Sequence, residues 1–187
     1  MKDRNAVLER WRTLEPPYPK GTRHKFMAAA VAVYAQRSER VLELGCNIGS
    51  NLAKLRDRGF HHLAGLDICP SALAAAGEQL GEDFQGFCGD LAEEIGNLVA
   101  AGPWEMVFSL ATLMHIHPDS DDALRRIPEF MSRHLIICEW ERGGTLYIEP
   151  RDYQAVFGDA LEQIACIEDL EVEGIVGYTL RVFRKVQ

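Results

Sequence analysis

The chain has 187 residues, enough for one well-packed domain and too few for two domains of ordinary size. Apolar residues make up 47% of it and charged residues 26%, a composition typical of globular proteins and unlike that of disordered chains. The net charge of -8 argues against a surface built to neutralise phosphates, so we do not expect a nucleic acid as substrate.

The sequence also lacks the signs of a membrane protein or a disulfide-stabilised one. No stretch approaches the roughly 20 apolar residues that cross a bilayer, and the charged start lacks a signal peptide's apolar segment. We therefore expect a cytoplasmic protein that has no membrane partner. The five cysteines are odd in number and form no C-x-x-C pair, so neither a disulfide framework nor a zinc knuckle is indicated. The oligomeric state stays open.

Two helices, over residues 6–14 and 24–37, are predicted ahead of the first strand. The proline-containing segment 15–21 between them cannot be helical, because prolines remove donors and fix φ. The leading region is aromatic and basic through Trp11, Tyr18, Arg23, His24 and Lys25. We expect one domain, in which residues 1–37 form a helical lid on a core of residues 38–187.

After this region, short aliphatic runs alternate with helix-like stretches, which is typical of parallel βαβ units. Strands are predicted at 40–44, 63–67, 85–88, 104–110, 134–140, 163–168 and 178–184. Helices are predicted at 50–58, 70–80, 91–101, 120–131 and 151–157. No credible helix separates the last two strands, so they should pair antiparallel. The pattern predicts an α/β three-layer sandwich with a seven-stranded, mostly parallel sheet whose last strand is antiparallel.

Residues 41–52 are the most informative segment, because a buried strand leads directly into a glycine-containing turn and then a helix. Gly45 and Gly49 are spaced G-x-x-x-G, and Glu43 lies two residues before the first glycine. Dinucleotide enzymes use G-x-G-x-x-G so that a pyrophosphate can sit at the helix N-terminus, but that register puts Asn47 at a glycine position. Asparagine is the best substitute for glycine where φ is positive, so the turn can still form.

Two more acids end the next two strands. Asp67 lies twenty-two residues beyond Gly45, at a strand end where a carboxylate can accept both ribose hydroxyls of a nucleoside. NAD enzymes use the same device, so Asp67 does not by itself separate the two cofactors. Asp90 follows the third strand. Acids at strand ends are often solvated turn residues or helix caps, and for Asp90 that alternative is equally open.

Taken together, these residues resemble the motifs of class I S-adenosylmethionine-dependent methyltransferases, whose first motif is E/D-x-G-x-G-x-G. Glu43, Gly45 and Gly49 are in register with it, and Asn47 departs from it at the middle glycine. The resemblance implies a Rossmann-like fold, S-adenosylmethionine as cofactor and a small-molecule methyl acceptor. It also implies that Asp90 bonds the adenine amino group. The implied cofactor-binding set is Glu43, Gly45, Cys46, Asn47, Gly49, Asp67, Ile68, Asp90, Leu91 and Leu110.

Residues 105–119 resemble the fourth motif region of the same family, where a strand end meets the sulfonium and the methyl acceptor. Ligands bind at the carboxyl ends of strands in open α/β sheets, so His115 and His117 are expected to meet substrate. Histidine can serve as a base near neutral pH if the acceptor must lose a proton. Alternatively, either histidine packs under the next helix or caps it. The H-x-H pattern followed by Asp119 also resembles part of a metal site, but an intact site needs a third ligand with suitable geometry, so we expect no metal.

Glu139 ends the fifth strand at the same edge and is a candidate base or amine-binding carboxylate, with Trp140 as a candidate wall. A structural role is equally open for both. Residues 41–153 also resemble, more finely, the small methyltransferases associated with pseudaminic acid biosynthesis. That resemblance implies that Arg151 and Asp152 shape the substrate side.

Two other functions stay open at this level. One is an NAD-dependent Rossmann-type oxidoreductase, against which the absence of a further glycine at Ser50 already counts. The other is a non-catalytic protein that binds an adenosyl metabolite. The sequence identifies neither the methyl acceptor nor the atom that is methylated.

Overall fold

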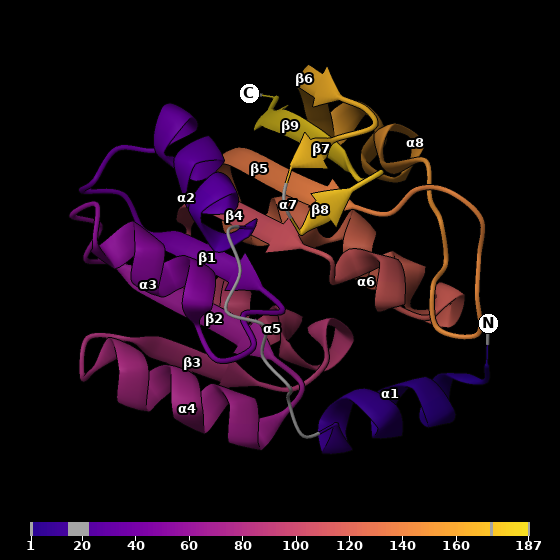
Figure 1. Cartoon of the computed structure of the whole chain (residues 1–187), viewed down its shortest axis with the longest axis horizontal. Helices are drawn as coiled ribbons and strands as arrows, with labels where there is room; N and C mark the ends of the chain where they lie inside the picture. Colours follow the sequence, from indigo (N-terminus) through magenta and orange to yellow (C-terminus); the bar gives the residue numbers. More distant parts are fainter. Residues whose placement is uncertain (1, 15–22, 173, 187) are drawn as a thin grey trace.

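The computed structural model describes residues 2–14, 23–172 and 174–186, and its main sheet has the order β3-β2-β1-β4-β5-β9-β6 (Figure 1). Neighbouring strands pair in parallel from β3 to β5, whereas β9 runs antiparallel between β5 and β6. The strands are β1 (Val41–Leu44), β2 (Leu63–Asp67), β3 (Gln85–Cys88), β4 (Trp104–Leu110), β5 (Met131–Glu139), β6 (Leu161–Ile167) and β9 (Thr179–Lys185). The predicted seven-stranded sheet with an antiparallel last strand is confirmed.

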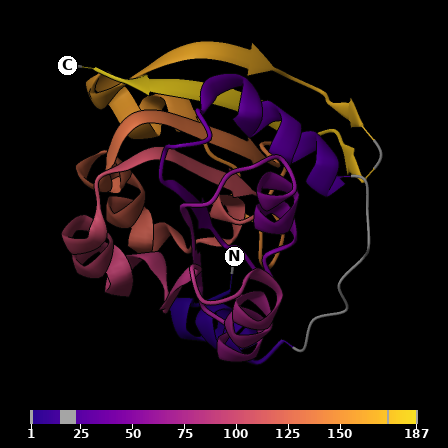
Figure 2. The same cartoon turned by 90° about the vertical axis from the view of Figure 1, so that its left-hand side faces the viewer.

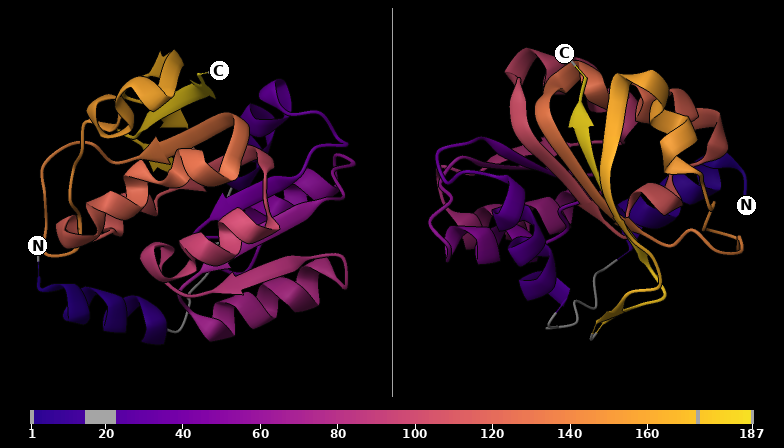
Figure 3. Two further views of the ribbon diagram at one scale, coloured as in Figure 1. Left: turned by 180° about the vertical axis from the view of Figure 1, so that it is seen from behind. Right: turned by 90° about the horizontal axis from the view of Figure 1, so that it is seen from above.

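Helices cover both faces of this sheet, so the predicted three-layer sandwich is also confirmed (Figures 2 and 3). One face carries α2 (Arg23–Tyr34), α3 (Ser50–Arg56) and α4 (Pro70–Leu80). The other carries α5 (Leu91–Ala101), α6 (Asp121–Arg125), α7 (Ile127–Phe130) and α8 (Tyr153–Phe157). Three short 3-10 turns complete this part of the chain: η1 (Leu113–His115), η2 (Pro118–Ser120) and η3 (Gly158–Ala160).

The sheet interior explains why these runs form strands. Parallel strands buried on both faces need continuous apolar sequence, and all four residues of β1 are buried. One core cluster, which includes Trp104 and Tyr153, lies under α5 to α8, and the other, which includes Met27 and Phe108, lies under α2 to α4. Glu43 is the one charged residue of β1, so its burial needs a separate explanation at the site.

The fourth predicted helix, over residues 120–131, is wrong as a single element, because the chain forms α6 and α7 there. Pro128 has no N–H and would clash with the preceding turn if one helix ran through it. The helix instead restarts at Ile127, which places Pro128 in the first turn, where proline is tolerated. Strand β5 consequently begins at Met131, which pairs with Trp104, and not at residue 134.

The segment between β6 and β9 contains a feature that the sequence did not predict. It forms a short antiparallel ribbon of β7 (Glu171–Val172) and β8 (Ile175–Val176). Strands of two residues carry no readable alternation, so nothing in the sequence pattern indicates them. The predicted antiparallel pairing of the last two long strands is confirmed.

Helix α1 (Arg4–Thr13) lies apart from both helical layers, at the edge of the sheet where the parallel strands end (Figure 1). The predicted proline-containing linker, with Tyr18, lies outside the described residues. In the described ranges no helix is long and apolar enough to cross a bilayer. Helix α1 and the carboxyl ends of the strands together frame the site.

Candidate functional site

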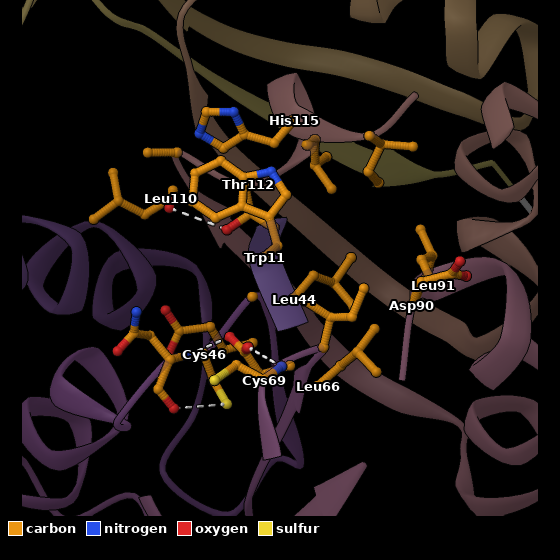
Figure 4. Close-up of a pocket in the computed structure, with 18 of the residues that line it drawn as sticks. Trp11, Leu44, Cys46, Leu66, Cys69, Asp90, Leu91, Leu110, Thr112 and His115 are labelled. Atoms are coloured by element: carbon orange, nitrogen blue, oxygen red, sulfur yellow. Dashed lines mark hydrogen bonds between the residues drawn. The ribbon is translucent and has the colours of Figure 1, made fainter. Parts of the chain in front are cut away.

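A cavity of about 470 Å³ lies at the ends of β1, β2 and β4, within the roughly 300–1,000 Å³ range of small-molecule sites. Figure 4 shows Trp11 and His115 on one side of the cavity and Cys46 and Cys69 on the opposite side. Asp90 lies beside Leu91, away from both groups. The predicted cofactor residues that line the cavity are Glu43, Gly45, Cys46, Asn47, Asp67, Ile68, Asp90, Leu91 and Leu110. The structure therefore brings nearly all of that set together around one space.

The turn after β1 places three residues in left-handed conformations, with φ of 74° at Gly45, 52° at Asn47 and 76° at Gly49. The expectation that Asn47 can replace glycine in this turn is confirmed. Its side-chain oxygen accepts a hydrogen bond from the backbone N–H of Ile48 at 2.7 Å, which stabilises the unusual conformation locally. At Gly45 a Cβ would lie 2.0 Å from Thr112 Oγ1, so the turn packs directly against the segment after β4.

Gly49 is the one predicted cofactor residue that the structure does not place on the cavity wall. It is the N-cap of α3, and a Cβ there would lie 2.8 Å from the side chain of Leu80 in α4. Its role in the structure is thus to let α3 and α4 approach each other. The second glycine of the motif shapes the site indirectly.

Asp67 ties the end of β2 to the glycine turn. Its carboxylate accepts hydrogen bonds from the backbone N–H of Asn47 at 2.7 Å and of Cys69 at 2.9 Å. Burial raises the pKa of Asp67, and these backbone hydrogen bonds oppose the rise. Each carboxylate oxygen has a second lone pair, so the group can still accept hydroxyl donors from a ligand in the cavity.

Glu43 is 1% exposed and belongs to a chain of polar side chains along the cavity wall. Asn51 in the first turn of α3 donates to the Glu43 carboxylate, and His24 Nδ1 lies 2.8 Å from Asn51 Oδ1. Burial raises the pKa of Glu43 well above its ordinary value, against the hydrogen bond from Asn51, while the charge of Asp67 adds to the rise. The wall therefore presents acidic groups where a cationic ligand would be stabilised.

Asp90 caps a helix and also lines the cavity, so the helix-cap alternative is confirmed, whereas the adenine-binding role stays a prediction. One oxygen accepts the backbone N–H of Glu93 at 3.0 Å, completing a capping box at the start of α5. The other accepts a hydrogen bond from Arg4 of α1 at 2.8 Å. Arg4 also donates to Ser120 at 2.8 Å, so α1 bridges two segments of the rim.

His115 is the better placed of the two histidines. Its ring lies 4.3 Å, centroid to centroid, from that of Trp11, and both line the cavity. Its Nδ1 lies 2.7 Å from the carbonyl oxygen of Tyr147, which can only accept, so Nδ1 carries the proton and Nε2 of the neutral ring is an acceptor. Burial lowers the pKa of His115, and the charge of Arg10 lowers it further, whereas the bond to Tyr147 opposes the change.

His117 also lines the cavity, but its Nδ1 accepts the backbone N–H of Asp119 at 3.1 Å and caps the turn η2. The capping alternative therefore describes the contact that His117 makes in this structure. His61 and His62, which lie just before β2, are exposed. In the described part of the chain, no three acidic, cysteine or histidine side chains gather as a metal site would require.

Glu139 does not line the cavity; its side chain is fully buried behind the segment after β4. Its carboxylate accepts hydrogen bonds from Ser109 Oγ and from backbone N–H groups of Thr112, Leu113 and Met114 at 2.7–3.2 Å. Burial raises its pKa to about 7, against the effect of these bonds. With no exposed surface, this carboxylate is not positioned to contact a substrate.

The sequence profile described as a methyltransferase domain matches residues 20–163, well over half of the chain. The chain belongs to the methyltransferase domain family. The predicted class, an S-adenosylmethionine-dependent methyltransferase, is thereby confirmed, and the NAD-dependent alternative loses its basis. No protein of curated function matches the chain in sequence.

Solved structures share the fold of this methyltransferase at low sequence identity. Magnesium protoporphyrin IX methyltransferase from Synechocystis PCC 6803, with bound S-adenosylhomocysteine, has a TM-score of 0.74 at 13% identity and covers 98% of this chain and 100% of its own. The 1,6-didemethyltoxoflavin-N1-methyltransferase of Burkholderia thailandensis has a TM-score of 0.74 at 15% identity, covering 98% and 87%. N-methyltransferase NodS from Bradyrhizobium japonicum WM9 has a TM-score of 0.71 at 16% identity, covering 99% and 100%.

Several residues of the methyltransferase site were not predicted from the sequence. Thr112, Arg4 and Tyr147 act through contacts with residues far away in the chain, which spacing alone does not reveal, whereas Asn51 contacts Glu43 eight residues before it. The contact of Asn51 is the one that the sequence could have suggested, because an amide in the first helical turn after a strand can donate to an acid in that strand. The other three depend on tertiary packing.

Proposed function

We propose that this methyltransferase transfers the methyl group of S-adenosylmethionine to a small molecule, and that the cavity at the strand ends holds both. The observation that carries the proposal is that one cavity joins the acid within β1, the acid at the end of β2 and the acid after β3 with the histidine after β4. Bound there, the cofactor supplies a methyl group already activated by a sulfonium cation. The acidic wall suits that cation, whereas a pyrophosphate would be repelled by it.

The cofactor roles that we propose follow from position. We propose that Asp67 accepts the ribose hydroxyls and that Asp90 and Leu91 contact the adenine, since all three residues line the cavity. We propose that the buried Glu43 lies near the sulfonium, where the positive charge of the bound cofactor would favour the ionised form of its carboxylate. Gly45 lets backbone approach the cofactor without a side chain in the way.

We propose His115 as the residue that meets the acceptor. Its neutral ring, with Nδ1 held by Tyr147, offers Nε2 as a proton acceptor for a hydroxyl or amine that loses its proton on methylation. The protein's main contribution is alignment of the acceptor with the methyl group in a space that excludes water. His117, engaged in its own turn, is the weaker candidate.

The size and covering of the cavity support a small acceptor. Helix α1 contributes Val7, Leu8 and Trp11 to its wall, which leaves limited room beside a nucleoside cofactor. The net charge of -8 supports the same view, because a nucleic-acid substrate would meet an acidic protein. The finer resemblance to methyltransferases of pseudaminic acid biosynthesis stays a prediction.

The first test is calorimetric titration of the purified chain with S-adenosylhomocysteine, followed by incubation with methyl-labelled S-adenosylmethionine and a desalted metabolite extract. We expect binding and transfer of label to a small molecule. Absence of binding would remove the proposal, whereas binding without transfer to any acceptor would favour a non-catalytic adenosyl-binding protein. His115→Ala should reduce transfer while leaving the affinity for S-adenosylhomocysteine nearly unchanged. His117→Ala is the matched variant on the same rim, and we expect a smaller loss from it.

A further inference from the structure

The segment after β4 adopts a backbone conformation that needs support. Ala111, directly after the strand, has φ of 56°, a left-handed conformation that is unfavourable for a residue with a side chain. The turn η1 follows at once and carries His115 at its end. A strained residue at this position persists only if the surrounding structure holds the turn in place.

Glu139 holds the N–H side of this turn. Its Oε1 accepts from the backbone N–H of Thr112 at 3.2 Å and of Leu113 at 3.1 Å, and its Oε2 accepts from that of Met114 at 3.2 Å. Ser109 Oγ donates to Oε1 at 2.7 Å and fixes the carboxylate from the strand below. These are the N–H groups at the start of a turn, which have no partner within it.

Arg151 holds the carbonyl side of the same turn. It is 8% exposed, and its guanidinium donates to the carbonyl oxygens of Leu113 at 3.2 Å and of Ile116 at 2.6 Å. Asp121 accepts two hydrogen bonds from Arg151, at 2.7 and 3.0 Å, and so fixes the guanidinium. A buried carboxylate therefore binds N–H groups of one short turn, and a buried guanidinium binds carbonyl groups of the same turn.

We propose that Glu139 and Arg151 form a clamp on residues 112–116, and that its function is to position His115 in the cavity. Among the described residues neither member of the clamp lines the cavity, so both are positioning residues. The inference rests on the proposed function in one respect only, namely that His115 is the group that meets the acceptor. It replaces the expectation that Glu139 itself is a base.

The clamp also fixes the proton on His115. With the turn held, Met114 accepts the backbone N–H of Glu149 at 2.8 Å, and His115 Nδ1 stays on the carbonyl of Tyr147. Arg10 of α1 is the charged group that acts on His115, and the ring of Trp11 covers one of its faces. If the clamp is lost, the ring gains water, and burial affects its pKa more than the opposing bond to Tyr147 does. The pKa should therefore return toward the ordinary 6.5.

The test is a pH titration of the full chain labelled with ¹³C and ¹⁵N in its histidines, with the His115 signals identified by their loss in His115→Gln. In the natural chain we expect His115 to titrate below 6.5 and its ring to show the Nδ1–H tautomer. In Glu139→Gln and Arg151→Met, the pKa should rise toward 6.5 and the two tautomers should mix. The controls are Glu141→Gln and Arg181→Met, which break a partly buried ion pair of 2.7 Å that does not touch the turn.

Asp121→Asn is the milder variant, which loosens Arg151 from a partly exposed position and keeps the test decisive if the buried substitutions prevent folding. It should shift the His115 signals in the same direction by a smaller amount. Unchanged His115 signals in the folded clamp variants would overturn the inference, as would equal shifts in the control pair. Calorimetry with S-adenosylhomocysteine is run on the same samples. A natural chain that fails to bind it refutes the proposed function, whereas the histidine spectra alone decide on the clamp.

Discussion

Replacing Gly45 by alanine should destabilise this methyltransferase more than the same change at a glycine that has free space for a Cβ. Two costs combine, because Gly45 has φ of 74° and its new Cβ would lie 2.0 Å from Thr112 Oγ1 and 2.6 Å from Thr112 Cβ. The left-handed conformation costs about 1–2 kcal/mol, and forcing a methyl group into a packed position adds about 1–3 kcal/mol. We therefore expect the free energy of unfolding to fall by about 2–5 kcal/mol.

Gly143 provides a control, because it also has a positive φ, of 37°, and no atom beyond its chain neighbours lies within 4 Å of the point that its Cβ would occupy. Gly143→Ala should thus show the conformational cost alone, about 1–2 kcal/mol. The assay is equilibrium urea unfolding of both variants, together with calorimetric titration of S-adenosylhomocysteine, whose affinity should fall only in Gly45→Ala. Equal destabilisation by the two substitutions would refute the close approach of the glycine turn to the segment after β4.

Three further outcomes follow from the site. Asp67→Ala should weaken binding of S-adenosylhomocysteine by about 1–3 kcal/mol through lost charge-assisted hydrogen bonds, and unchanged affinity would remove Asp67 from the site. Arg4→Ala should speed the dissociation of S-adenosylhomocysteine in stopped-flow measurements, because Arg4 bridges Asp90 and Ser120 across the rim. Arg12→Ala, on the same helix but in an exposed pair, is its control, and equal rates would argue against the bridge. Because burial raises the pKa of Glu139 from 4.5 to about 7, the folded chain binds this proton more tightly than the unfolded chain. The free energy of unfolding should then fall, from this group, by on the order of 3 kcal/mol between pH 4.5 and 7. Urea unfolding of Glu139→Gln should lack that component, and an identical pH profile would contradict the assignment.

Most of the sheet could be predicted from the sequence because its strands are short apolar runs bounded by turn residues. Strand β2, for instance, ends in Asp67 as predicted, since an acid after a buried run marks the end of burial. The division between α6 and α7 was harder to predict. Pro128 is tolerated in a first helical turn, so its presence alone does not show whether a helix begins there or bends.

The candidate site also contains residues that could be predicted from the sequence and residues that could not. The glycine turn and the acids after β2 and β3 were predictable because one short motif or one strand end determines where each lies. The role of Glu139 was not, because a carboxylate at a strand end looks the same in sequence whether it faces a cavity or a backbone turn. The contacts that define its role are with Ser109 and with the backbone of Thr112, Leu113 and Met114, which lie 25–30 residues away from it in the chain.

Asn47 bears on how relatives of this chain can be found. A search pattern that requires glycine at all three positions of the first motif would miss this sequence. The backbone at Asn47 nevertheless has a positive φ, as it does at Gly45 and Gly49. A pattern written in terms of residues that accept positive φ, with asparagine allowed beside glycine, would retain it. Genomes searched in that way should yield further methyltransferases whose cofactor turn is stabilised by an amide side chain.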